Sequence, residues 1–170
     1  MAFFVRKINV ENWPDGVVRL NTSIDNLPAD SITSDLKTTN NDLSFWKIEN
    51  LTEIDKVGMA IVSSFDKTPR TLFLVALSYE DIANNFTIKN TPKHGKTAIV
   101  EMKQYHYDVR NLNYKLLGEV SNLIASATAN PQHLYVIPID ITSVTNQIKA
   151  LVGTPAVDSN ALGEYIKNQL

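Results

Sequence analysis

The chain has 170 residues, a formal net charge of −2 and no cysteine. Its length suits a single domain, and its 44% of hydrophobic residues indicates a globular protein with a buried core. The absence of cysteine excludes disulfides, thiolate nucleophiles and cysteine-ligated metal sites. The slightly acidic charge argues against a protein that coats nucleic acid. We expect one domain over residues 1–170.

The first residues do not resemble a secretory signal, because Arg6 and Lys7 follow the short apolar run instead of preceding it. No apolar run approaches the roughly 20 residues that a membrane span needs. We therefore expect a cytoplasmic protein that does not contact a membrane.

The first half of the chain predicts a unit of strand, helix and strand. Residues 3–8 have the β-branched and aromatic composition of a first strand, and 17–20 could return as a second. Residues 43–48 predict a strand, 54–62 an amphipathic helix and 72–77 a continuous apolar strand. This succession is typical of a right-handed βαβ unit, so we expect 72–77 to be a central strand of a sheet that is parallel at least in part.

The second half predicts further helices and one strand. The predicted elements are a start of a helix at 27–30, a short helix from Ser78 to about 86, a helix over 112–127, a strand over 134–139, a helix over 141–151 capped by Asp140, and a final short helix after Pro155. Residues 97–102 fit a strand or the first turns of a helix equally well. The expected fold class is α/β, or α+β, with a central mixed sheet of four to six strands covered by helices.

Glu101 and Lys103 follow the apolar run 98–100. A strand ending in Glu-x-Lys, followed by a helix and a strand, resembles part of the motif of the PD-(D/E)xK nuclease family. The resemblance implies that Asp81 and Glu101 would bind Mg²⁺ and that Lys103 would position or activate water. This interpretation needs 97–103 to be a strand beside 72–77, with the two carboxylates close together.

Charge is distributed unevenly along the chain. Residues 87–115 contain six Lys or Arg and two acidic residues, a net charge of +4, so the remaining residues together carry −6. The segment could therefore bind an anionic ligand. The candidate binding residues are Lys93, Lys96, Lys103, Tyr105, His106 and Arg110.

Two further features suggest binding or acid–base chemistry. If a helix began early, His106, Arg110 and Tyr114 would share one face and could act on an anionic substrate. Trp46, next to Phe45, is either a core residue or part of an exposed binding edge. The polar and aromatic segment 29–48 resembles the N-terminal halves of a group of small bacterial proteins without assigned activity.

The leading functional hypothesis is a small binding or accessory protein, because the sequence contains no complete catalytic set. Such a protein would act through a protein partner or as a homo-oligomer and would need no cofactor. The alternatives are the Mg²⁺-dependent nuclease of Asp81, Glu101 and Lys103, and an enzyme that uses His106 and Arg110.

Overall fold

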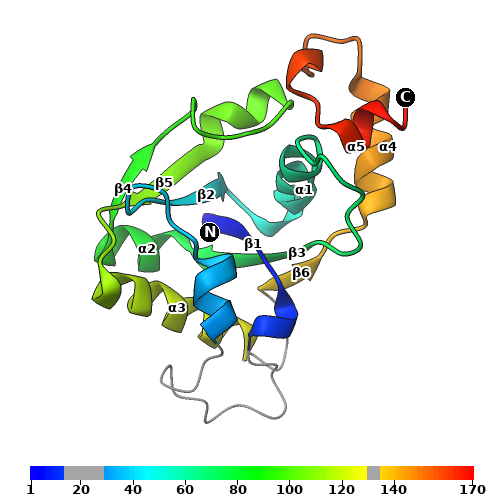
Figure 1. The fold of residues 1–170 in the computed structure, drawn as a ribbon. Coiled ribbons are helices and arrows are strands. Elements are labelled where there is room, and N and C mark those ends of the chain that lie inside the picture. Colours follow the sequence, from blue (N-terminus) through cyan, green and yellow to red (C-terminus); the bar gives the residue numbers. More distant parts are fainter. Residues whose placement is uncertain (14–28, 130–134) are drawn as a thin grey trace.

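A six-stranded sheet forms the centre of the computed structural model, which describes residues 1–13, 29–129 and 135–170 (Figure 1). The strands lie in the order β4-β5-β2-β1-β3-β6, and every neighbouring pair is antiparallel. Their bounds are β1 Phe3–Ile8, β2 Leu43–Ile48, β3 Phe73–Ser78, β4 Thr87–Asn90, β5 His106–Arg110 and β6 Val136–Pro138. The α/β fold class is confirmed, with a six-stranded sheet covered by helices.

The predicted crossover unit is present, but its two strands are not neighbours. Strand β1 pairs antiparallel with β2 on one side and with β3 on the other, so β2 and β3 run in the same direction with β1 between them. The expectation of parallel neighbouring strands is therefore wrong. In a simple βαβ unit β2 and β3 would be adjacent strands, but here the N-terminal strand β1 lies between them. Strand β3 is internal, with β1 and β6 beside it, but it is not at the middle of the sheet.

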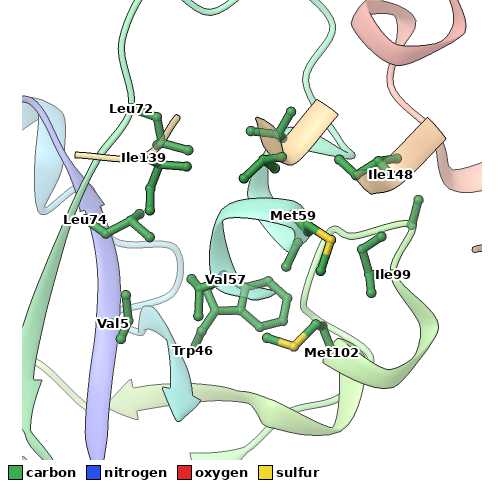
Figure 2. Packing of buried hydrophobic residues seen from close by; sticks show 14 of the residues in the cluster. Val5, Trp46, Val57, Met59, Leu72, Leu74, Ile99, Met102, Ile139 and Ile148 are labelled. Carbon is green, nitrogen blue, oxygen red and sulfur yellow. The ribbon is translucent and has the colours of Figure 1, made fainter. Parts of the chain in front are cut away.

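One face of the sheet, the α1 face, is covered by a mostly helical layer. This layer comprises α1 (Ile54–Val62), α4 (Ile141–Leu151), α5 (Glu164–Lys167) and a 3₁₀ helix over Val100–Tyr105. Figure 2 shows how side chains from these elements meet the sheet, with Trp46 of β2 beside Val57 of α1 and Met102 of the 3₁₀ helix. Because the apolar side of each helix packs on this face, the core here is continuous from α5 to β2.

The other face, the α3 face, packs against α2 (Tyr79–Asn85), α3 (Tyr114–Thr128) and a π-helix over Ser31–Asp35. The half-buried Arg6 side chain joins the π-helix to the sheet. Its Nε and Nη2 donate to the carbonyl of Asp35 at 2.9 and 2.6 Å, and Nη1 donates to that of Ser44 at 2.7 Å. Burial lowers the pKa of Arg6 to about 10, an effect opposed by the nearby Asp35 charge, so the guanidinium remains charged at neutral pH.

Local sequence signals account for most of the helix ends. Ser78 accepts a hydrogen bond from the backbone N–H of Asp81, and Asp140 accepts one from Ser143, as N-caps do. Gly153 adopts a φ of 86°, which is easily reached only by glycine, two residues after α4 ends. The remaining short elements are 3₁₀ helices at Val10–Asn12, Leu51–Glu53 and Ser159–Ala161.

Residues 87–110 differ most from the expectations. They form strand β4, a loop over 91–99, the 3₁₀ helix over Val100–Tyr105 and strand β5. The stripe of His106, Arg110 and Tyr114 on one helix does not exist, because the first two belong to β5 and Tyr114 begins α3. The predicted short strand at 17–20 and the helix start at 27–28 lie outside the described residues.

Candidate functional site

A row of polar side chains crosses the α1 face where the helical cover ends. Asp108 of β5 is the register partner of Lys89 of β4 on one side and of Ser44 of β2 on the other. Ser44 also lines an open hollow of about 300 Å³ whose wall includes Arg6 and Lys7 of β1. The row therefore runs from Lys89 of β4 through Asp108 of β5 to Ser44 of β2, next to the hollow that Lys7 of β1 also lines.

Asp108 is the most buried charged group of this row, with a side chain 2% exposed. Its Oδ1 accepts a hydrogen bond from the Ser44 hydroxyl at 2.9 Å, and its Oδ2 lies 2.8 Å from Nδ1 of His94. Burial alone would raise the pKa of the Asp108 carboxyl, but hydrogen bonds from His94, Ser44 and Thr91 outweigh it and lower the pKa below its ordinary value. The group is therefore a carboxylate at neutral pH.

His94 projects from the loop over 91–99 with a side chain that is 62% exposed. An ionised carboxylate can only accept hydrogen bonds, so Nδ1 of His94 must be the donor. In the neutral imidazole, Nε2 then carries the lone pair. The described part of the chain offers Nε2 no hydrogen-bond partner, so the structure presents an oriented imidazole nitrogen to solvent.

The loop that carries His94 is held down by buried contacts. The backbone N–H of Thr91 donates to the carbonyl of His106 at 2.8 Å, and that of His94 donates to the carbonyl of Thr91 at 2.9 Å. Gly95 lies so close to the ring of Trp46 that a Cβ there would be 2.9 Å from Cη2. Glycine is thus required for the loop to lie flat on the sheet.

His106 and Trp46 support this loop from below and are not themselves accessible. The two rings meet edge to face with centroids 5.0 Å apart, and they are only 3% and 8% exposed. Nδ1 of His106 lies 2.9 Å from Oγ1 and 3.1 Å from the carbonyl of Thr91. Since the sheet is covered on both faces, Phe45 is buried as well. The prediction of an exposed binding edge at Trp46 is therefore wrong.

The other candidate binding residues fall into two groups. Lys93 and Lys96 are exposed on the loop, and Tyr105 is exposed near the end of the 3₁₀ helix. Arg110 pairs with Asp42 at 3.1 Å, and Lys103 pairs with Asp158 at 3.4 Å. Only the first group offers cations that are free of an ion pair within the described residues.

The residues of the nuclease hypothesis are not brought together on a common strand. Glu101 and Lys103 lie on the 3₁₀ helix of the α1 face, whereas Asp81 lies on α2, whose buried residue Ile82 packs on the α3 face. Strand β3 has β1 and β6 as neighbours, not residues 97–103. Across residues 1–13, 29–129 and 135–170, no group of three or more His, Asp or Glu side chains is arranged to hold a metal ion.

Sequence reasoning missed the pairing of His94 with Asp108. The two residues are 14 apart along the chain, and the connection between β4 and β5 has no regular pattern that predicts their approach. Recognising 106–110 as a strand would have placed Asp108 on the same face as His106 and Arg110, because alternate residues of a strand share a face. Nothing in the sequence indicates that the loop folds back over that face.

Comparison with protein-family models, with curated protein sequences and with solved structures finds no match. In the described segments, no helix combines the length and the apolar character that crossing a membrane requires.

Proposed function

We propose that the chain is a cytoplasmic binding protein that engages an acidic segment of a protein partner. The binding region would be the lysine surface, which we define as Lys89, Lys93 and Lys96. The observation that supports it most is the charge of this stretch: residues 87–100 contain these three lysines and no Asp or Glu. All three lysines are exposed, and none forms an ion pair within the described residues.

The rest of the site favours a protein over a nucleic acid as the partner. Proteins that bind single-stranded nucleic acid stack bases on exposed aromatic rings. Here Trp46 and His106 are buried beneath the loop, Tyr105 is 38% exposed, and the fully exposed Tyr114 lies at the start of α3, outside the loop that carries the lysines. Clustered cations without a stacking platform suit flexible carboxylates, which need charge complementarity and no ring contact. The absence of cysteine agrees with a reducing compartment.

The binding of a labelled glutamate-rich peptide, followed by fluorescence anisotropy, tests this proposal. We expect the triple variant Lys89→Gln, Lys93→Gln, Lys96→Gln to weaken binding by about tenfold, since several surface charges each contribute roughly 0.2–1 kcal/mol. Added salt should weaken wild-type binding as well, because the interacting charges are exposed.

The matched control removes the same charge elsewhere. Lys56, Lys115 and Lys167 each lie near a glutamate on their own helix or just before it, so changing these three to Gln lowers the net charge equally. Equal weakening by both triple variants, or no binding at all, would contradict the proposal. Tighter binding of a single-stranded oligonucleotide would assign the surface to nucleic acid, and self-association in sedimentation that the lysine variant abolishes would make a second copy the acidic partner.

A further inference from the structure

The proposed peptide binding depends on exposed lysines and does not involve the pair of His94 and Asp108. The geometry of this pair suits a chemical reaction. A buried carboxylate holds Nδ1–H of His94 at 2.8 Å, while the opposite nitrogen faces solvent. Carboxylates placed in this way fix the tautomer and orientation of an imidazole and stabilise the cation that it becomes when Nε2 forms a bond. The pair therefore provides an oriented nitrogen nucleophile.

Supporting contacts fix the pair before any ligand arrives. Asp108 is anchored by the Ser44 hydroxyl at 2.9 Å and by its place in the middle of β5. The His94 loop is fixed through Thr91 and through Gly95 against Trp46. A reactive side chain held by packed and hydrogen-bonded neighbours is what precise chemistry requires.

The exposure of His94 distinguishes between two uses of such a nitrogen. A general base usually works in a site that excludes water, which strengthens its electrostatic effects. His94 is 62% exposed on an open surface instead. An exposed nitrogen suits covalent group transfer, because the donor, and later an acceptor, must reach it from outside. Lys93 and Lys96 beside it favour a group that carries negative charge.

We propose that Nε2 of His94 accepts a phosphoryl group from a small acyl phosphate. The lone pair of Nε2 attacks phosphorus, the N–P bond forms, and the bond between phosphorus and the bridging oxygen breaks. The acyl group leaves as a carboxylate with the bonding electron pair. The Nδ1 proton stays on Nδ1, where Asp108 stabilises the positive charge of the phosphorylated ring. No electrons are transferred to an outside acceptor, and no further reactant is needed.

This activity goes beyond the proposed peptide binding, and the two can fail separately. The His94→Asn variant retains Lys89, Lys93 and Lys96, so peptide binding should persist where phosphorylation is lost. Conversely, a chain that is phosphorylated at His94 but does not bind the acidic peptide would contradict the proposed function and still support this inference.

The experiment incubates the full chain with acetyl phosphate and follows intact mass and ³¹P-coupled NMR spectra. We expect a mass increase of one phosphoryl group, removed by acid, with phosphorus bonded to Nε2 of His94. The His94→Asn variant should gain none, and His133→Asn should behave as the wild type. Asp108→Asn should slow the reaction by about tenfold or more, because an amide can donate to Nδ1 and move the ring proton to Nε2.

A comparison within one molecule guards against loss of folding in the Asp108 variant. Peptide mapping gives the ratio of phosphorylation at His94 to that at His133 in the native wild type and in the wild type unfolded by urea. We expect a ratio well above one in the native chain and near one in urea. A ratio near one in both states, phosphorylation of His94→Asn equal to wild type, or no phosphorylation at all would overturn the proposal.

Discussion

The charge of Asp108 determines what the neighbouring histidines can do. Its carboxylate is nearly fully buried yet ionised, because the side chains of Ser44 and His94 donate hydrogen bonds to it. Such a group orders its surroundings, since each donor would be left unpaired and desolvated if it moved away. Both histidines lie near this carboxylate, but they differ in exposure. His94 is exposed and donates a hydrogen bond to Asp108, whereas His106 is buried and has a lowered pKa.

His106 makes the folded chain sensitive to acid. Burial lowers the pKa of His106, against the opposing influence of the Asp108 charge and the Thr91 carbonyl. The unfolded chain therefore binds a proton at a higher pH than the folded chain does, and stability falls as the pH drops below the unfolded pKa of about 6.5.

We predict that His106→Asn flattens this dependence. The Asn side chain can still donate to the Thr91 carbonyl but does not titrate. Urea unfolding at a series of pH values from about 7 to about 5 should show a smaller loss of stability for this variant than for the wild type. Tyr105→Phe, a nearby change that leaves the histidines in place, should keep the wild-type slope. An unchanged slope in His106→Asn would contradict the account.

The loop between β4 and the 3₁₀ helix is an element whose position depends on one small residue. A Cβ at Gly95 would lie 2.9 Å from Trp46 Cη2 and 3.0 Å from the Cβ of His106. Both rings are buried and packed, so neither can move aside without cost.

We predict that Gly95→Ala destabilises the chain by about 1–3 kcal/mol, the usual cost of overpacking. It should also lift the loop and weaken the contact between His94 and Asp108, visible as a changed His94 ring signal in NMR spectra. Lys93→Ala, an exposed change in the same loop, should stay within about 0.5 kcal/mol of the wild type. Equal stability of both variants would mean that the loop does not pack on Trp46 as described.

Sequence patterns predicted the strands and helix starts that are determined by residues close together in the chain. Strands β1 and β2 have the predicted bounds, and the cap residues Ser78 and Asp140 start the helices that they were expected to start. These features depend on alternation, helical periodicity and short-range hydrogen bonds, all of which neighbouring residues determine.

The sequence did not predict strands β4 and β5, because these segments form strands through pairing with their neighbours and lack a strand pattern of their own. Strand β4 is a short edge strand of four residues, Thr87–Asn90, and only Ile88 among them is apolar. Strand β5 carries His106, Asp108 and Arg110 on one face, a pattern as polar as that of a surface helix. The pairing of His94 with Asp108 was missed for the same reason, since it joins β5 to the loop beside it, whereas Lys93 and Lys96 of that loop were among the predicted binding residues.

Over the whole molecule, the sheet is shared by two hydrophobic cores. Phe3 and Val5 of β1 point into the core on the α1 face, while Phe4 and Ile8 point into that on the α3 face. Because alternate residues of one strand support both cores, neither core can be lost without disturbing the other. The chain should therefore unfold as one cooperative unit.

The two tryptophans allow this cooperativity to be tested. Trp46 lies in the core of the α1 face and Trp13 in that of the α3 face. In Trp13→Phe the fluorescence reports only on Trp46, and in Trp46→Phe only on Trp13. We predict that fluorescence and far-UV circular dichroism give coincident urea transitions within each variant. A fluorescence transition that precedes the loss of circular dichroism in either variant would show that the two faces unfold separately.

The protonation state of the His94 ring is the feature on which the geometry of the site and the proposed chemistry both depend. If Asp108 is ionised and accepts a hydrogen bond from Nδ1, the neutral ring must carry its proton on Nδ1 and a lone pair on Nε2. Long-range ¹H–¹⁵N NMR spectra of the folded chain distinguish the two ring nitrogens. We predict a protonated Nδ1 and an unprotonated Nε2 for His94 at slightly alkaline pH, and loss of this pattern in Asp108→Asn. A His94 ring with its proton on Nε2, or one that averages between both forms, would contradict the described site.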